Sequence, residues 1–132
     1  MDRSPRRSPT IAFADRFVDE QEMYVAGLIA RGLRVVTIDD EDPFAAALTI
    51  GVLNPQAVVT RLCPDLFGIE LTRCLREHRA FADIPVVLLT THGDTETHDL
   101  ARAAGVTAIY VLPLTPHALA DALVLLTDYQ PA

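Results

Sequence analysis

The sequence predicts an α/β domain built on a doubly wound, five-stranded parallel sheet with helices on both faces. Short apolar runs alternate five times with longer amphipathic segments along the chain. The runs are apolar enough to be covered on both faces, as strands in parallel sheets are. Each gap between runs is long enough for a crossover helix, and such crossovers are right-handed.

Five strands and five helices are expected in strict alternation. The strands are expected at residues 11–14, 33–38, 57–60, 84–90 and 106–112. The helices are expected at residues 18–30, 42–52, 68–79, 95–104 and 116–126.

Local signals mark the elements in the first half of the chain. The first strand is an apolar run that stops at Asp15, and the amphipathic helix after it is closed by Gly32. The second strand is rich in β-branched residues. Asp42 and Pro43 then form the N-cap and first-turn pair that opens an Ala-rich second helix.

The second half of the chain carries similar signals. The third strand ends at Thr60 and is followed by a loop and the third helix, and the clearest strand of the chain ends at Thr90. Gly105 occupies the position that closes the fourth helix. Thr115 caps the last helix, in which Leu and Ala residues lie on one stripe.

Length and composition fit one domain with a single continuous core. The chain has 132 residues, half of them hydrophobic, which is enough for a core without disulfides or a structural metal. We expect residues 1–9 to form a flexible basic tail and residues 10–129 to form the domain, with no output domain after it. Cys63 and Cys74 have no metal-ligand spacing and indicate a reducing, cytoplasmic compartment.

Charge and hydropathy narrow the classes of partner. The net charge is −7 at pH 7, and an acidic body repels phosphate backbones, so we expect no nucleic-acid binding. No apolar run approaches the roughly 20 residues that span a bilayer, so we expect no membrane contact. All eleven basic residues are Arg and none is Lys, a composition that suggests a GC-rich bacterial genome.

Three segments resemble the receiver domains of bacterial response regulators. Residues 54–71 resemble the third strand and the Pro…Gly loop of that family, residues 84–91 resemble the fourth strand with its terminal Thr, and residues 104–114 resemble the fifth strand with the Pro after it. Together with the alternation of strands and helices, the resemblance covers about residues 10–128. It implies the flavodoxin-like receiver fold and a signalling role in a two-component or phosphorelay pathway.

The resemblance also identifies the positions of the family's phosphorylation site. In this chain they are Asp15, Arg16, Thr60, Arg61, Thr90, Leu112 and Pro113. Receivers carry an acidic pair after the first strand, and Arg16 replaces its second carboxylate. The phosphoacceptor Asp, counted back from the loop Pro and Gly, is replaced by Thr60. The Lys that pairs with the phosphoryl group is replaced by Leu112, whereas the family's hydroxyl is kept at Thr90.

These replacements predict a degenerate pseudo-receiver. Neither Thr60 nor Arg61 can form an acyl phosphate. Mg²⁺ is bound through carboxylates and phosphates, and Asp15 beside Arg16 and Arg61 is a poor site, so we expect no cofactor and weak or absent Mg²⁺ binding. We expect a guanidinium to pair with Asp15 in the space that a metal fills in active relatives. The chain is then expected to be a protein-interaction module that acts without phosphorylation.

The resemblance also implies a partner surface. Receivers use the face made by the fourth helix, fifth strand and fifth helix for protein partners and dimers. The apolar candidates on this face are Tyr110, Leu114, Leu119, Leu123 and Leu126. Because the apolar residues of the last helix extend beyond one narrow stripe, we expect part of them to be exposed for a signalling partner, or for a second copy of the chain.

Other chemistry-bearing residues are interpreted as structural. Asp42 in the acidic turn 39–42 is expected to cap a helix rather than to bind a metal. Residues 92–99 contain two His and several carboxylates, but their spacing favours a polar loop with Asp94 or Thr95 as N-cap. The bond before Pro113 is often cis in receivers, and the sequence leaves its state open.

Two alternative functions are weighed against the pseudo-receiver. Asp65, in the loop after the third strand, would be the displaced acceptor of a phosphate-controlled switch. A flavodoxin-like small-molecule binder is less favoured, because residues 15–22 contain no Gly, Ser or Thr to hold a cofactor phosphate. No Ser-His-Asp arrangement, P-loop or metal motif stands out, so we expect no enzymatic activity.

Overall fold

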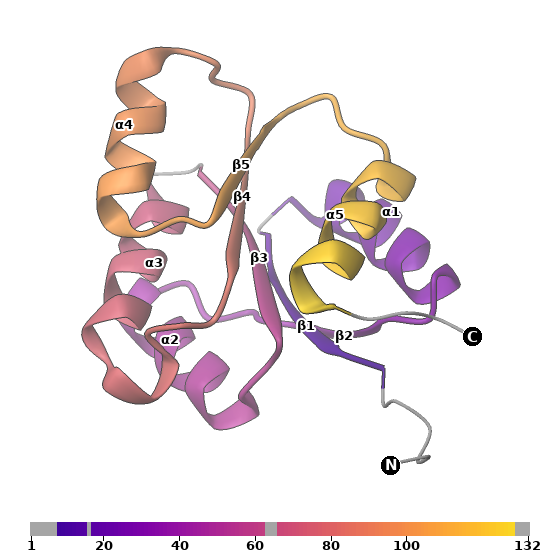
Figure 1. Cartoon of the computed structure of the whole chain (residues 1–132), viewed down its shortest axis with the longest axis horizontal. Coiled ribbons are helices and arrows are strands. Elements are labelled where there is room, and N and C mark those ends of the chain that lie inside the picture. Colours follow the sequence, from indigo (N-terminus) through magenta and orange to yellow (C-terminus); the bar gives the residue numbers. More distant parts are fainter. Residues whose placement is uncertain (1–7, 16, 63–65, 129–132) are drawn as a thin grey trace.

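The computed structural model describes residues 8–15, 17–62 and 66–128, and it contains the expected alternation of strands and helices (Figure 1). The strands are β1 (Thr10–Ala14), β2 (Arg34–Thr37), β3 (Ala57–Arg61), β4 (Val86–Thr90) and β5 (Ala108–Val111). The helices are α1 (Val18–Ala30), α2 (Pro43–Leu53), α3 (Phe67–Glu77), α4 (Thr95–Ala104) and α5 (Pro116–Thr127), with a short 3-10 helix at Arg79–Phe81. Within these described ranges, no helix is long and apolar enough to cross a membrane.

The five strands form one parallel sheet in the order β2-β1-β3-β4-β5. The chain builds outward from β1 first in one direction and then in the other, which places helices on both faces. Helices α1 and α5 cover one face, and α2, α3 and α4 cover the other (Figure 1). The predicted doubly wound fold is confirmed.

Capping residues set the helix ends close to the predicted limits. Asp42 accepts a hydrogen bond from the Ala45 amide at 3.0 Å at the start of α2, and Thr115 accepts one from the Ala118 amide at 3.1 Å at the start of α5. Gly105 ends α4 with a φ of 100°, in the left-handed region that glycine adopts without strain.

Three strands are shorter than predicted. β2, β4 and β5 each lack residues that the apolar runs include, because pairing begins or ends inside the run. Pro85 illustrates the cause: it has no amide hydrogen to donate to a neighbouring strand, and β4 begins at the next residue.

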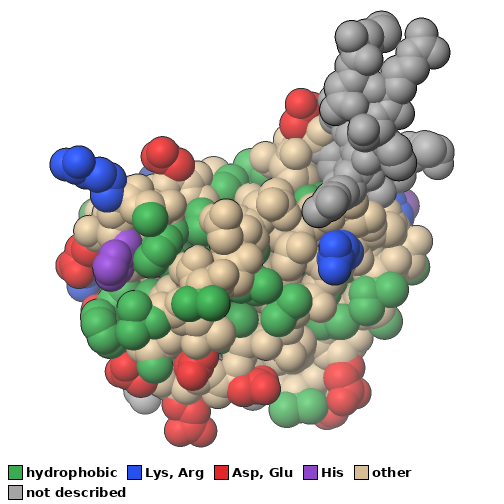
Figure 2. Space-filling view, turned by 90° about the horizontal axis from the view of Figure 1, so that it is seen from below, with side chains coloured by type: hydrophobic (Ala, Val, Ile, Leu, Met, Phe, Trp, Pro, Cys, Tyr) green, Lys and Arg blue, Asp and Glu red, His purple; other side chains and the backbone are tan. Residues whose placement is uncertain are grey.

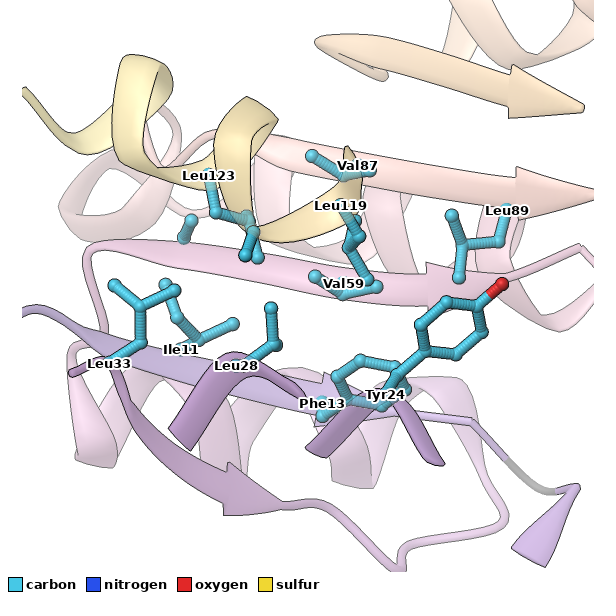
Figure 3. Close-up of a cluster of buried hydrophobic side chains, with 12 residues drawn as sticks. Ile11, Phe13, Tyr24, Leu28, Leu33, Val59, Val87, Leu89, Leu119 and Leu123 are labelled. Atoms are coloured by element: carbon cyan, nitrogen blue, oxygen red, sulfur yellow. The ribbon is translucent and has the colours of Figure 1, made fainter. Parts of the chain in front are cut away.

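The largest core cluster lies between the sheet and the helices α1 and α5 (Figure 3). Leu28 from α1 and Leu119 and Leu123 from α5 are completely buried against the strands. The prediction that Leu119 and Leu123 form a partner surface is therefore wrong, because the apolar stripe of α5 faces the sheet. Tyr110, Leu114 and Leu126, also predicted for that surface, are partly buried and pack against the same cluster.

The two helices on this face are in very close contact. Gly27 of α1 lies against Pro116 of α5, and a Cβ added to Gly27 would collide with the Cβ of Pro116. The hydroxyl of Tyr24 in α1 also donates a hydrogen bond to the carbonyl oxygen of Leu114 at 2.6 Å. Helix α1 is thus fixed both to α5 and to the loop before it.

The opposite face carries two further core clusters. Ala46, Ala47 and Ile50 of α2 pack with Leu71 and Leu75 of α3 over the sheet. A smaller cluster joins α3 and α4 to β4. Both faces of the sheet are therefore covered, as the apolar strands require.

Candidate functional site

The carboxyl ends of the strands bring the predicted site residues to one edge of the sheet. Asp15 directly follows β1, and Thr60 lies opposite Ala14 in the pairing of β3 with β1. Arg61 is the last residue of β3 and Thr90 is the last residue of β4. The register of the parallel strands therefore places these residues close together at one edge of the sheet.

Asp15 is only 4% exposed at this edge. Its Oδ1 accepts a hydrogen bond from the Phe17 amide at 2.9 Å, but its Oδ2 is buried without a hydrogen-bond partner among the described residues. Such an oxygen costs free energy unless a proton or another group satisfies it. Arg16, which is predicted to replace a family carboxylate, lies outside the described residues.

Glu20, in the first turn of α1, is a site residue that the sequence analysis missed. Its carboxyl group is within hydrogen-bonding reach of the Asp15 carboxyl. The pKa of Glu20 is raised to about 7, and burial is the largest cause. The hydrogen bond to Asp15 and the negative charge of Asp15 add to this shift, whereas the positive charge of Arg61 opposes it. The proton that Glu20 retains is then available for a hydrogen bond to Asp15, whose Oδ2 has no other partner among the described residues.

The guanidinium of Arg61 completes this group. Its side chain is 12% exposed, and Nη1 lies 3.3 Å from Oε2 of Glu20. The guanidinium carbon lies 4.4 Å from the centre of the Phe17 ring, in the geometry of a cation–π contact. Arg61 therefore pairs with Glu20. The prediction that a guanidinium pairs with Asp15 also concerns Arg16, which lies outside the described residues, so it stays a prediction.

Two buried threonines stand at the strand ends. Thr60 is fully buried, and its hydroxyl donates a hydrogen bond to the carbonyl oxygen of Ala14 at 3.1 Å. Thr90 is also buried, and its hydroxyl accepts a hydrogen bond from the His92 amide at 3.0 Å. The hydroxyl of Thr60 thus ties β3 to β1, and the hydroxyl of Thr90 caps the end of its own strand.

Leu112 and Pro113 line a cavity of about 350 Å³ at the same edge. The other lining residues are Glu20, Met23, Tyr24, Arg61, Thr91 and Leu114. The bond between Leu112 and Pro113 is cis. The charged groups of this cavity are thus the paired Glu20 and Arg61, and Leu112 adds an aliphatic wall.

The described residues at this edge combine carboxylates with a cation. Among the residues that the structure describes, no group of three or more His, Cys, Asp or Glu side chains is placed to hold a metal ion. Mg²⁺ is held by carboxylate and phosphate oxygens. Here Asp15 and Glu20 are accompanied by the Arg61 cation, and Thr60 supplies a hydroxyl that is already bonded to backbone.

The remaining candidates in the described ranges have structural roles. Asp42 caps α2, as predicted. Asp94 caps α4 by accepting hydrogen bonds from the amide and hydroxyl of Thr97, each at 2.9 Å, and these bonds lower the pKa of Asp94. Both capping predictions are confirmed. Asp65 and Cys63 lie outside the described residues.

This chain is similar to chemotaxis and response-regulator proteins. No family model matches it. A chemotaxis protein CheY homolog of Campylobacter jejuni is 33% identical over 60 residues, which are 46% of this chain and 46% of that protein. The solution structure of a response regulator protein from Burkholderia multivorans aligns with this chain at 28% identity and a TM-score of 0.73. The alignment covers 95% of this chain and 98% of the Burkholderia chain. The chain is thus similar in sequence to a chemotaxis protein over part of its length, and similar in fold to a response regulator over most of it.

The receiver fold extends beyond the region of sequence similarity. The chain spans about half the length of the curated relatives it matches. Another similar structure is the receiver domain of a sensor histidine kinase from Pseudomonas aeruginosa, with a magnesium ion coordinated in its active-site cleft. The alignment covers 92% of this chain and 99% of the Pseudomonas chain. Its TM-score is 0.80 at 20% identity, so this likeness concerns the fold.

Proposed function

We propose that this chain is a receiver-like signalling domain of a two-component or phosphorelay pathway that binds a protein partner without being phosphorylated. The observation that carries the proposal is the burial and hydrogen bonding of Thr60. At the position counted for the phosphoacceptor stands a fully buried hydroxyl that is bonded to the carbonyl oxygen of Ala14. No carboxylate is present there to form an acyl phosphate.

The surrounding residues support the same proposal. Arg61 follows Thr60 and pairs with Glu20, so a cation and its counter-ion already occupy the edge of the sheet. Leu112 supplies an aliphatic chain where receivers have a Lys for the phosphoryl group. The proposal therefore includes weak or absent Mg²⁺ binding and no catalytic activity.

Incubation of the full chain with acetyl phosphate and Mg²⁺ tests the proposal. We expect the intact mass to stay unchanged, while a receiver with an Asp at the acceptor position gains one phosphoryl group under the same conditions. Millimolar Mg²⁺ alone should leave the amide spectrum around Asp15 and Glu20 unchanged. A phosphoryl increment on this chain would overturn the proposal.

The alternative switch with a displaced acceptor is decided in the same assay. If a phosphoryl group is gained, the Asp65→Asn variant should lose it when Asp65 is the acceptor. Asp39→Asn serves as the matched control, because Asp39 is an exposed acidic residue near the edge of the sheet. A small-molecule binder remains the less favoured alternative, since α1 begins without a Gly, Ser or Thr to hold a phosphate.

The proposal places the domain in the cytoplasm, in contact with protein rather than with nucleic acid. The net charge of −7 supports this choice of partner. A homodimer through α4, β5 and α5 remains a prediction, and Val111 and Leu125 are exposed apolar side chains on those elements. Sedimentation velocity over a range of protein concentrations tests it.

A further inference from the structure

Helix α2 is apolar on its outer side as well as on its inner side. Ala46, Ala47 and Ile50 face the core and are buried. Phe44 and Leu48 are 58% and 43% exposed. A helix that is hydrophobic all round is normally buried all round, so the outer side of α2 requires an explanation.

The exposed residues form a continuous stripe. Phe44, Leu48 and Val52 are spaced four residues apart, which aligns them along one side of a helix over about 12 Å. Val52 is 90% exposed. We call these three residues the α2 stripe. Scattered exposed apolar residues are ordinary, whereas an aligned group is typical of an interaction site.

Acidic groups lie next to the start of the α2 stripe. The turn before α2 contains four acidic residues in succession, residues 39–42. Asp42 caps the helix through the Ala45 amide, and Asp40 accepts a hydrogen bond from the hydroxyl of Thr49 at 2.7 Å. The acidic turn is thus attached to α2 itself.

The neighbouring helix α3 adds further negative charge. Cys74 of α3 packs against the same core cluster as α2. Burial is the largest cause that raises the pKa of the Cys74 thiol. The negative charges of Glu77, Glu70 and Asp42 raise this pKa further, and the positive charge of Arg73 lowers it. Arg73 is paired with Glu70 at 2.8 Å, so the balance of charge at the junction of α2 and α3 is negative. On the face shown in Figure 2, hydrophobic side chains form a band with several acidic side chains below it, and Arg and His side chains lie above it and at one end.

We propose that the α2 stripe is a docking surface for an amphipathic helix of a protein partner whose apolar residues are flanked by Arg or Lys. The apolar stripe buries the apolar face of such a helix, and the acidic surroundings attract its basic residues. The inference rests on the proposed function as a protein-interaction module. It names a surface different from the α4–β5–α5 face.

A synthetic helical peptide with Leu at every third or fourth position and Arg on both flanks tests the inference. Titrated into the full chain, it should shift the amide signals of residues 43–53 and bind more weakly as salt is added. Phe44→Ser and Leu48→Ser should each weaken binding about tenfold or more. Ile29→Ser is the matched control, because Ile29 is a 56% exposed apolar residue on α1, and it should leave binding unchanged.

Several outcomes would overturn the inference. They are equal binding of a peptide with Glu in place of Arg, amide shifts centred on another face, no binding at millimolar peptide, or sedimentation showing that a second copy covers the α2 stripe. Thermal melts of the variants confirm that the exposed substitutions leave the fold intact. Because the acetyl phosphate assay is separate, failure of the peptide to bind leaves the proposed function standing, and phosphorylation would overturn that function alone.

Discussion

The carboxyl groups of Glu20 and Asp15 face each other beside Arg61, and this arrangement makes stability depend on pH. The pKa of Glu20 is raised to about 7, whereas in the unfolded chain Glu20 titrates at its lower, ordinary pKa. At a pH between these two pKa values, the folded state therefore binds more protons than the unfolded chain. The stabilisation is present in full below the unfolded pKa and is lost as the pH rises through about 7.

Glu20→Gln removes this dependence. Gln stays neutral, so the decrease in the free energy of unfolding between about pH 5 and about pH 8 should be smaller by about 1–2 kcal/mol than in the native chain. Urea unfolding at both pH values measures it. Glu22→Gln is the matched control, because Glu22 is an exposed residue of the same helix. An unchanged pH dependence in Glu20→Gln would show that the two carboxyl groups do not share a proton.

Motif spacing located Thr60 and Leu112 in the sequence because their positions are counted within single strands and loops. Glu20 could not be found in this way. Its place beside Asp15 depends on how α1 is rotated against the sheet, and that rotation is set by the packing of Tyr24 and Leu28. An acidic residue in the first turn of the helix after β1 was the only local signal.

At the scale of elements, Arg76 joins three parts of the chain. From α3, its Nε donates to the carbonyl oxygen of Gly105 at 3.0 Å, and its Nη1 donates to that of Ile84 at 2.8 Å. Its Nη2 lies 3.5 Å from the hydroxyl of Thr107. Arg76 thus fixes α3 to the segment before β4 and to the turn between α4 and β5.

Arg76→Ala should lower the free energy of unfolding by about 2–3 kcal/mol, because it leaves partly buried carbonyl groups without a donor. Arg73→Ala is the control, since Arg73 pairs with Glu70 on the same helix at the surface and should cost less than about 1 kcal/mol. Chemical denaturation of both variants measures the difference. Equal effects would mean that water replaces the Arg76 contacts.

Strand and helix order could be predicted because each element has a local signal. The helix caps at Asp42, Asp94 and Thr115 are examples, since each side chain bonds to an amide three residues away. The role of Arg76 could not be predicted, because its partners lie 8 to 31 residues away in sequence. Only the packed structure brings them together.

At the scale of the molecule, α5 shows how packing decides which apolar residues form the core. Leu119 is fully buried between α5 and the sheet, whereas Leu125 is 82% exposed. Both are leucines of one largely apolar helix, so composition does not separate them. The packing of α5 against the sheet makes this distinction, and it is the reason why Leu119 and Leu123 were wrongly predicted for the partner surface.

Leu119→Ala should therefore destabilise the protein by about 2–5 kcal/mol through the cavity it leaves. Leu125→Ala should change stability by no more than about 0.5 kcal/mol. Thermal unfolding followed by circular dichroism compares the two variants. A small effect of Leu119→Ala would contradict the docking of α5 described above.

The contact between Gly27 and Pro116 restricts how this protein can diverge. Any side chain at residue 27 would collide with the proline ring, so a lineage that acquires one must also alter residue 116 or separate the two helices. Substitutions at these two sites should therefore occur together among descendants of this sequence, although nearly ninety residues separate them along the chain.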